Sequence, residues 1–363
     1  MAKRLIATVI NDLTYDRRMI RICTTLAESG FEVTLVGRQL RHSKPLITEP
    51  FQQKRLKCIF NKGFLFYAEY NLRLLWFLLK TPADIINSTD ADTLVACGLA
   101  SKLKGKIHVH DAHEYFSEVP EVADRPFVKA FWKRIEKMFI PKADAAYTVC
   151  QSIADIYSKN YGIPFEVIMN VPPLKDSKPE GNAVGEKYLI YQGALNKGRG
   201  LEAIIMAMHQ VDCQLKIAGE GDLSEELRSL VKAKGLESKI EFLGMIKPGE
   251  LEVITRNAYI GLNVCENLGL NYYLALSNKG FDYFHAGIPA VTNDFPEYQR
   301  LNARFETMIL TEAEPQKLAK SINQLLNDQT LYEKLRKNCI IAAQELNWQK
   351  ESEKLKAIYE RYR

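Results

Sequence analysis

Hydrophobic positions along the chain fall into short, almost continuous apolar runs that alternate with longer segments of helical periodicity. The runs at 3–11 and 31–37 are largely apolar, as strands are when both faces of a parallel sheet are covered. The segment 19–28 between them repeats apolar residues at helical spacing and ends at Ser29-Gly30. This order predicts a right-handed βαβ unit. The unit lacks GxGxxG, which argues against a nicotinamide-dependent enzyme.

The alternation of strands and helices continues through the rest of the chain. Further strands are expected at 56–60, 83–87, 106–110, 145–150, 165–171, 187–191, 214–218, 240–244, 259–265 and from 289 onward. Further helices are expected at 63–80, 93–103, 128–139, 152–161, 201–208, 223–233, 248–256, 280–285, 315–327, 331–346 and 348–363. A charged, proline-rich stretch at 172–182 has no apolar periodicity and indicates a linker. We therefore predict an α/β fold of two Rossmann-like domains that face a central cleft.

The length of 363 residues exceeds what one hydrophobic core comfortably supports, which agrees with two domains. We place the first domain at 1–171 and the second at 172–346. The final helix, at 347–363, is expected to cross back to the first domain.

Composition narrows the class of protein. With 47% hydrophobic and 26% charged residues, the chain is typical of a folded globular protein. The net charge of +5 is too small to indicate a nucleic acid partner. The seven cysteines contain no CxxC pair and predict buried thiols in a reducing compartment. No run resembles a signal peptide or reaches the length of a bilayer span, so a cytoplasmic location is expected.

The segment 63–80 is strongly apolar but contains Glu69, Asn71 and Arg73. We predict a helix buried against the sheet. The alternative is a helix that lies on a membrane surface, and its sparse, lysine-poor polar face argues against it. Peripheral contact with the inner membrane face stays open.

Two acids, Asp90 and Asp92, follow a predicted strand and form a DxD pattern. Such a pattern can hold Mg²⁺ or Mn²⁺ beside a diphosphate. Acids at the start of a helix also complement the helix dipole, and we favour this capping interpretation.

A predicted strand that contains His108 and His110 runs into Asp111, His113 and Glu114. The two strand histidines share one face, so their imidazoles could converge. The residues past the strand's carboxyl end fit the edge of an active site better than a metal cage. For the strand histidines, a hydrogen-bonded place in the core is as plausible as a catalytic role, whereas for His113 the active-site role is favoured.

In the second half, a glycine-rich basic loop at 192–200 joins a strand to a helix. Gly193 lets the backbone approach a ligand closely, and Lys197 and Arg199 can neutralise phosphate charge. An ordinary flexible turn with solvated charges is the alternative. The loop is not a Walker loop, because the GxxxxGK[ST] order is missing.

A second candidate for phosphate binding follows the strand at 259–265. Glu266 ends this strand, a polar and aromatic loop follows, and Asn278 and Lys279 precede a helix. Ligands bind at this corner of open α/β sheets, and a helix N-terminus offers N–H groups to a phosphate. Asn278 as a simple helix cap is the alternative, but it does not explain the polar loop.

Several motifs, taken in order, resemble family 4 glycosyltransferases of the GT-B fold. They are Asp16-Arg17 with Leu26-Ala27 to Val33, Asp111-Ala112-His113-Glu114, Gln192-Gly193 through Lys197-Gly198, Ile217 to Gly221 with Phe242 to Gly244, and Ser277 to Pro289. Two positions depart from the family pattern. Of its paired acids, the first falls on Leu274 and the second on Asp282, shortened from Glu. The arginine after the phosphate-loop glycine is Ala194.

The resemblance implies an enzyme that transfers a sugar from a nucleotide-sugar to an acceptor hydroxyl, with retention at the anomeric carbon and without a metal or other cofactor. It implies a saccharide or lipid-linked saccharide acceptor and a role in cell-surface polysaccharide or glycoconjugate synthesis. We assign catalytic roles to Asp111, His113, Lys197 and Asp282. We assign donor binding to Gly193, Lys197, Arg199, Glu220, Glu266, Asn278 and Lys279. We assign the acceptor side to Asp12, Asp16, Arg17 and Glu114. A nucleotide-sugar epimerase of the same fold and a non-catalytic scaffold remain the alternatives, the latter because of the two departures.

Overall fold

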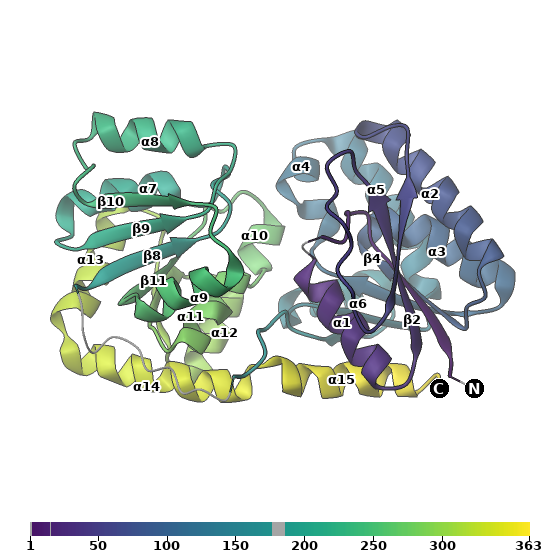
Figure 1. The fold of residues 1–363 in the computed structure, drawn as a ribbon. Helices are drawn as coiled ribbons and strands as arrows, with labels where there is room; N and C mark the ends of the chain where they lie inside the picture. The colour runs from purple at the N-terminus through teal and green to yellow at the C-terminus, as the bar shows by residue number, and fades with distance from the viewer. Residues whose placement is uncertain (1, 15, 176–185) are drawn as a thin grey trace. The chain divides into compact units, whose positions relative to one another are not determined.

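The computed structural model describes residues 2–14, 16–175 and 186–363. The chain forms two compact units, one from residues 1–170 with 351–363 and the other from 171–350. Each unit contains one parallel β-sheet flanked by helices (Figure 1). Residues 172–175 of the expected linker are described, and its remaining residues, 176–182, lie outside the described part of the chain. The prediction of two Rossmann-like α/β units is confirmed.

The first unit is built on a seven-stranded sheet with the order β3-β2-β1-β4-β5-β6-β7. Its strands are β1 (Arg4–Thr8), β2 (Glu32–Gln39), β3 (Gln52–Lys57), β4 (Ile85–Thr89), β5 (Ile107–Ala112), β6 (Ala145–Thr148) and β7 (Phe165–Val167). Its helices before the linker are α1 (Arg17–Glu28), α2 (Gly63–Lys80), α3 (Asp90–Lys104), α4 (Pro120–Ala123), α5 (Pro126–Phe139) and α6 (Gln151–Tyr161), with short 3-10 turns at Phe116–Glu118 and Ile140–Lys142. The strand order reverses between β1 and β4, and ligands bind at the carboxyl ends of strands at such a switch point.

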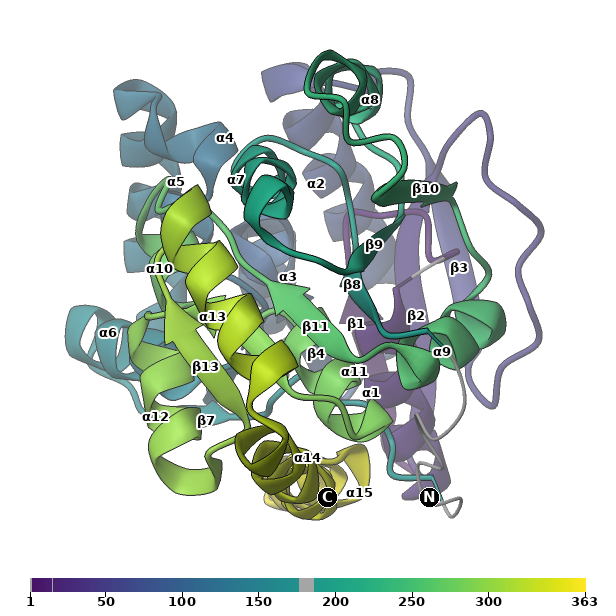
Figure 2. The same cartoon turned by 90° about the vertical axis from the view of Figure 1, so that its left-hand side faces the viewer.

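The second unit has a six-stranded sheet with the order β10-β9-β8-β11-β12-β13. Its strands are β8 (Tyr188–Gln192), β9 (Gln214–Ala218), β10 (Ile240–Gly244), β11 (Ile260–Asn263), β12 (Ala290–Asn293) and β13 (Met308–Thr311). Its helices are α7 (Leu201–Ala207), α8 (Ser224–Ala233), α9 (Pro248–Asn257), α10 (Leu270–Leu274), α11 (Asn278–Ala286), α12 (Pro296–Phe305), α13 (Pro315–Asn327) and α14 (Gln329–Glu345), with a 3-10 turn at Met208–Gln210. Helices α7 and α13 pack together, and α9 and α11 pack together elsewhere on the sheet (Figure 2). Here the switch point lies between β8 and β11.

The sequence pattern misplaced one strand and missed several elements. Strand β3, expected at 56–60, is an edge strand of sequence QQKRLK, too polar to give an apolar run. Helices α10 and α12 and strand β13 were not expected. The expected buried helix is α2, and its core side is Phe66, Tyr70, Leu74 and Leu78.

The last helix, α15 (Trp348–Glu360), carries the chain back to the first unit. Tyr359 on this helix is fully buried. Its hydroxyl accepts a hydrogen bond from Asn87 Nδ2 at 3.2 Å and lies 3.3 Å from the Tyr147 hydroxyl. The Glu351 carboxylate accepts the backbone N–H of Met169 at 2.8 Å. The prediction that the C-terminus packs on the first domain is confirmed for α15, whereas α14 packs against α11 in the second unit.

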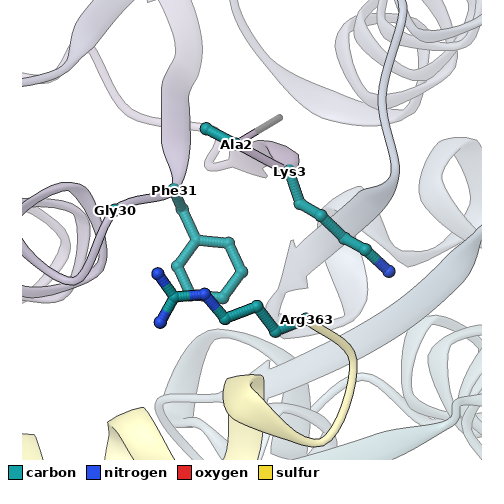
Figure 3. A pocket seen from close by; sticks show the side chains of 5 residues that line it. All are labelled: Ala2, Lys3, Gly30, Phe31 and Arg363. Carbon is teal, nitrogen blue, oxygen red and sulfur yellow. The ribbon is translucent and has the colours of Figure 1, made fainter.

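A shallow pocket near both chain ends is explained by this packing. It is lined by Ala2, Lys3, Gly30, Phe31 and Arg363 (Figure 3). The Arg363 guanidinium lies 5.9 Å from the centre of the Phe31 ring. The pocket therefore sits at the amino ends of β1 and β2, at the opposite edge of the sheet from the switch point.

We expect Tyr359→Ala to lower the free energy of unfolding by about 3–5 kcal/mol, because it removes a fully buried aromatic ring from the first unit. Tyr359→Phe keeps the ring and loses only the hydroxyl contacts, so a loss of about 1 kcal/mol is expected. Urea unfolding followed by circular dichroism measures both. Equal, small effects of the two variants would show that the first unit does not depend on α15.

Candidate functional site

In the first unit, a buried ion pair positions the loop that follows β5. Arg18 on α1 is 4% exposed and donates to Asp111 Oδ1 at 3.0 Å and to the Ile168 carbonyl at 2.9 Å. Asp111 is fully buried at the end of β5, and its Oδ2 accepts from His113 Nε2 at 2.8 Å. The three side chains thus form a hydrogen-bonded series that runs from the core to the partly exposed imidazole of His113.

The charges of Asp111 and His113 follow from this geometry. Burial would raise the pKa of Asp111, but Arg18 and His113 outweigh it and hold that pKa at about 2. Burial would lower the pKa of His113, but the Asp111 carboxylate outweighs it and leaves that pKa raised. Asp111 is therefore an anion that favours the protonated imidazole and occupies its Nε2, so that Nδ1 is the nitrogen left to meet a ligand.

The capping interpretation of Asp90 and Asp92 needs a correction. Both acids lie in the first turn of α3, as expected, but Thr89 precedes the helix and makes no side-chain cap. Asp90 Oδ1 instead accepts the backbone N–H of His113 at 2.8 Å. Burial raises the pKa of Asp90 to about 6 and also raises the pKa of Asp92. Asp90 thus holds the His113 loop at the switch point between β1 and β4.

His108 and His110 occupy the core. Both imidazoles hydrogen-bond the Ser88 hydroxyl, at 2.9 and 3.0 Å. Burial lowers the pKa of His108 to about 3 and that of His110 to about 4, so both are neutral near pH 7. Of the two interpretations left open, this geometry favours the hydrogen-bonded core. Within the described ranges, no group of three or more His, Cys, Asp or Glu side chains is arranged to hold a metal.

The residues assigned to the acceptor side have structural contacts of their own. Asp12 Oδ1 accepts the Thr14 backbone N–H at 3.2 Å. Asp16 caps α1, since its carboxylate accepts the Met19 backbone N–H at 3.0 Å. Arg17 and Glu114 are exposed. The sequence singled out Arg17, whereas the arginine that reaches Asp111 is its buried neighbour.

In the second unit, glycines and a backbone bond bring the two predicted loops together. A Cβ on Gly219, in the loop after β9, would lie 1.9 Å from the Gly193 carbonyl oxygen, so only glycine fits where that loop crosses the loop after β8. The Glu266 backbone N–H donates to the Gly198 carbonyl at 2.9 Å. The loop after β8 and the loop after β11 therefore meet at the switch point of this sheet.

Two cations lie on aromatic rings at this corner. The Arg199 guanidinium lies 5.0 Å from the centre of the Tyr272 ring, and Lys279 Nζ lies 3.9 Å from that of Tyr191. Burial and the charge of Arg199 lower the pKa of Lys279 to about 7. Arg199 Nε is buried with no hydrogen-bond partner. Lys197, on the same loop as Arg199, is exposed.

Arg199 and Lys279 carry charge of the same sign at this corner. Burial is the main cause of the lowered pKa of Lys279, and the positive charge of Arg199 lowers that pKa further. In the described part of the chain, no carboxylate forms an ion pair with Arg199 or Lys279. A phosphate group would satisfy both cations and the orphaned Nε together.

The start of α11 lies at the same corner. Asn278 is the first residue of the helix and is exposed, so it is not the cap. Ser277 precedes the helix, and its hydroxyl donates to Asn263 Oδ1 at 2.6 Å instead of capping. Within the first turn the Gly280 N–H donates to the Ser277 carbonyl at 3.1 Å, and the partial positive charge of the helix N-terminus lies at this corner.

Asp282 on α11 and Glu220 in the loop after β9 both contact other side chains. Asp282 Oδ2 accepts from Gln192 Nε2 at 2.7 Å, and Gln192 Oε1 accepts from the Thr255 hydroxyl at 2.6 Å. Glu220 forms an ion pair with Arg228 at 2.6 Å, which lowers the pKa of Glu220. Leu274, at the place of the first family acid, is buried at the end of α10.

Comparison with known proteins accounts for both units. A model of Glycosyltransferase Family 4 matches residues 16–173, and a model of Glycosyl transferases group 1 matches residues 174–345. The chain belongs to the family 4, group 1 glycosyltransferases. The chain is thus a glycosyltransferase, and the resemblance inferred from its motifs is confirmed.

Solved structures confirm that this glycosyltransferase has the GT-B fold. It superposes on sucrose-phosphate synthase from Thermosynechococcus elongatus with a TM-score of 0.80 and 17% identity, over 99% of each chain. It superposes on Anabaena Alr3699/HepE in complex with UDP-glucose with a TM-score of 0.77 and 13% identity, again over 99% of each chain.

One curated relative matches only part of the chain. The glycosyltransferase is 29% identical over 120 residues to N-acetylgalactosamine-N,N'-diacetylbacillosaminyl-diphospho-undecaprenol 4-alpha-N-acetylgalactosaminyltransferase of Campylobacter jejuni. The match spans 31% of this chain and about a third (33%) of the relative.

We expect Arg18→Met to lower the free energy of unfolding by about 3–5 kcal/mol, because it leaves the buried Asp111 carboxylate without its partner. The double variant Arg18→Met/Asp111→Asn removes both charges and should lose less than the sum of the single variants. Arg17→Met, at the exposed neighbour, should change stability by no more than about 0.5 kcal/mol. Urea unfolding of the unaltered protein, Arg18→Met, Asp111→Asn, the double variant and Arg17→Met measures the coupling, and additive single effects would contradict it.

Proposed function

We propose that the enzyme transfers a sugar from a nucleotide-sugar to a hydroxyl group of a saccharide, free or lipid-linked, with retention at the anomeric carbon and no required metal. We place this reaction in the synthesis of a cell-surface polysaccharide or glycoconjugate. The observation that carries the donor site is the pair of cations, Arg199 and Lys279, at the N-terminus of α11.

The donor's diphosphate fits this corner by charge. As the bond between sugar and phosphate breaks, negative charge grows on the departing diphosphate. Arg199 and Lys279 supply positive charge there, with Lys197 on the same loop as Arg199, and the N-terminus of α11 adds its partial positive charge. These groups would neutralise the charge of the departing diphosphate, as a bound metal does in other transferases, which supports a metal-independent reaction.

The donor's other groups would meet the acids of the same unit. Glu266 and Asp282 are assigned to the ribose or sugar hydroxyls, and Asp282 is held toward its role by Gln192. In the first unit, His113 is assigned to the reacting sugar. Asp111 fixes the ring of His113 and favours its charged form, so that its Nδ1 can donate to a sugar hydroxyl.

The acceptor is proposed on the relative's printed activity. The Campylobacter enzyme acts on a saccharide linked through diphosphate to undecaprenol, which supports a lipid-linked acceptor for this chain. An acceptor of that kind would bring the enzyme into peripheral contact with a membrane. No helix among the described residues is both long and apolar enough to cross one.

Thermal melting against nucleoside diphosphates tests the donor site. A ligand present at about 100 times its dissociation constant stabilises the fold by about 2.7 kcal/mol. For a unit of this size, the melting temperature should rise by roughly 5–10 °C. We expect a rise with one nucleotide, uridine diphosphate being the first to test, and its loss in Lys279→Ala.

Lys320→Ala, on the exposed side of α13, is the matched control and should keep the rise. Absence of a rise with every nucleotide would contradict the donor site. Release of nucleoside diphosphate only when an acceptor is present would support transfer. Release of free sugar epimer without acceptor would instead support epimerisation.

Nucleotide-sugar affinity should fall as the pH rises above about 7. The pKa of Lys279 in the folded protein is lowered to about 7, so its positive charge is lost as pH rises through that value. The diphosphate of a nucleotide-sugar does not titrate in this range, so the dependence reports the protein. Isothermal titration calorimetry between pH 6 and about 9 measures it, and Lys279→Arg, always charged, should flatten the profile. An unchanged profile in Lys279→Arg would assign the pH dependence elsewhere.

A further inference from the structure

Helix α2 has two apolar sides, and only one of them is in the core. Phe66, Tyr70, Leu74 and Leu78 point into the core of the first unit. The opposite side presents a stripe at helical spacing that is exposed: Leu65, Leu72, Trp76 and Leu79. Leu72 is 68% and Trp76 is 62% exposed. Exposed large apolar side chains in a contiguous row mark an interaction surface.

Helix α5 continues this surface. Phe127, Phe131 and Met138 form its exposed apolar stripe, and Phe127 is 92% exposed. The rings of Phe64 on α2 and Phe131 on α5 lie 6.0 Å apart in an edge-to-face contact. The two helices lie side by side in the first unit (Figure 1). We call the exposed stripes of α2 and α5, with Phe64, the outer apolar face.

Cations border this face. Helix α5 carries Lys129, Lys133, Arg134 and Lys137, while its one acid, Glu136, is buried. Arg134 and Lys137 are exposed beside the apolar stripe. On α2, Lys80 Nζ lies 4.1 Å from the centre of the Trp76 ring. A nearby acid, Glu69, is bound by Arg73 and by the backbone N–H groups of the loop before α2.

We propose that the outer apolar face binds an anionic phospholipid surface, with its aromatic and aliphatic side chains in the headgroup region and Arg134, Lys137 and Lys80 on lipid phosphates. This combination of exposed Trp and Phe with flanking Lys and Arg suits an interface of apolar chains and anionic headgroups. A symmetric contact with a second copy fits less well, because it would bring the cations of one copy close to the same cations of the other. The proposal identifies the surface for the peripheral contact proposed above. It stands independently of the reaction, since lipid binding needs neither donor nor acceptor.

Co-sedimentation with vesicles tests the proposal on the full chain. We expect the protein to bind vesicles of phosphatidylglycerol and phosphatidylethanolamine at least tenfold more tightly than vesicles of phosphatidylcholine. Trp76→Ser/Phe127→Ser should weaken binding to the anionic vesicles at least tenfold. Val253→Ser/Ile341→Ser, two exposed apolar residues of α9 and α14, is the matched control and should bind as the unaltered protein does.

Charge is tested separately. Arg134→Glu/Lys137→Glu should weaken binding at least tenfold at 0.1 M salt, whereas Lys320→Glu/Lys337→Glu on α13 and α14 should not. All four variants should keep the nucleotide melting shift, which shows that they are folded and that loss of lipid binding is distinct from loss of the donor site.

Equal binding to both vesicle types, or equal effects of face and control variants, would overturn the proposal. Sedimentation velocity without lipid provides a further outcome. A dimer that the Trp76→Ser/Phe127→Ser variant converts to a monomer, with no vesicle binding, would assign the face to self-association instead.

Discussion

The ion pair between Arg18 and Asp111 is the contact on which the first unit's site depends. Both side chains are out of solvent, so neither charge tolerates loss of the other. The pair joins α1, the end of β5 and the segment after β7, because Arg18 also holds the Ile168 carbonyl. Three elements far apart in the sequence are thereby fixed at one edge of the sheet, and His113 takes its orientation and charge from that arrangement.

The second unit works by the opposite arrangement. Its cations, Arg199 and Lys279, face each other's charge, with aromatic rings rather than carboxylates beneath them. A site that is fully paired in the free protein would have to break its own contacts to admit a diphosphate. Here an anion can bind without first displacing a carboxylate from the cations. The close approach at Gly219 and the hydrogen bond of the Glu266 backbone N–H hold the loops in place.

Much of this could be predicted from sequence, for definable reasons. Central parallel strands such as β1 and β8 are largely apolar. The glycine-rich loop follows a strand and the Ser277–Lys279 corner begins a helix, which are the places where ligands bind in open α/β sheets. Arg18 and Tyr191 could not be found this way, and neither could the contact of Asp90 with His113, since these roles come from contacts between residues far apart in sequence. A buried arginine beside an exposed one gives no local signal. The outer side of α2 was misjudged for a related reason: apolar content does not reveal which side is covered.

Helix α15 has a consequence for how the protein is made. The core of the first unit contains Tyr359, so a ribosome must synthesise almost the whole chain before that core can be completed. Domains generally fold as they emerge, the N-terminal one first. In this chain, Asn87 and Tyr147 would not have their contacts with the Tyr359 hydroxyl until the second unit and α15 have been synthesised. The two units are therefore finished in the reverse of their order along the gene, and a chain cut short near its end would leave the first unit unfinished.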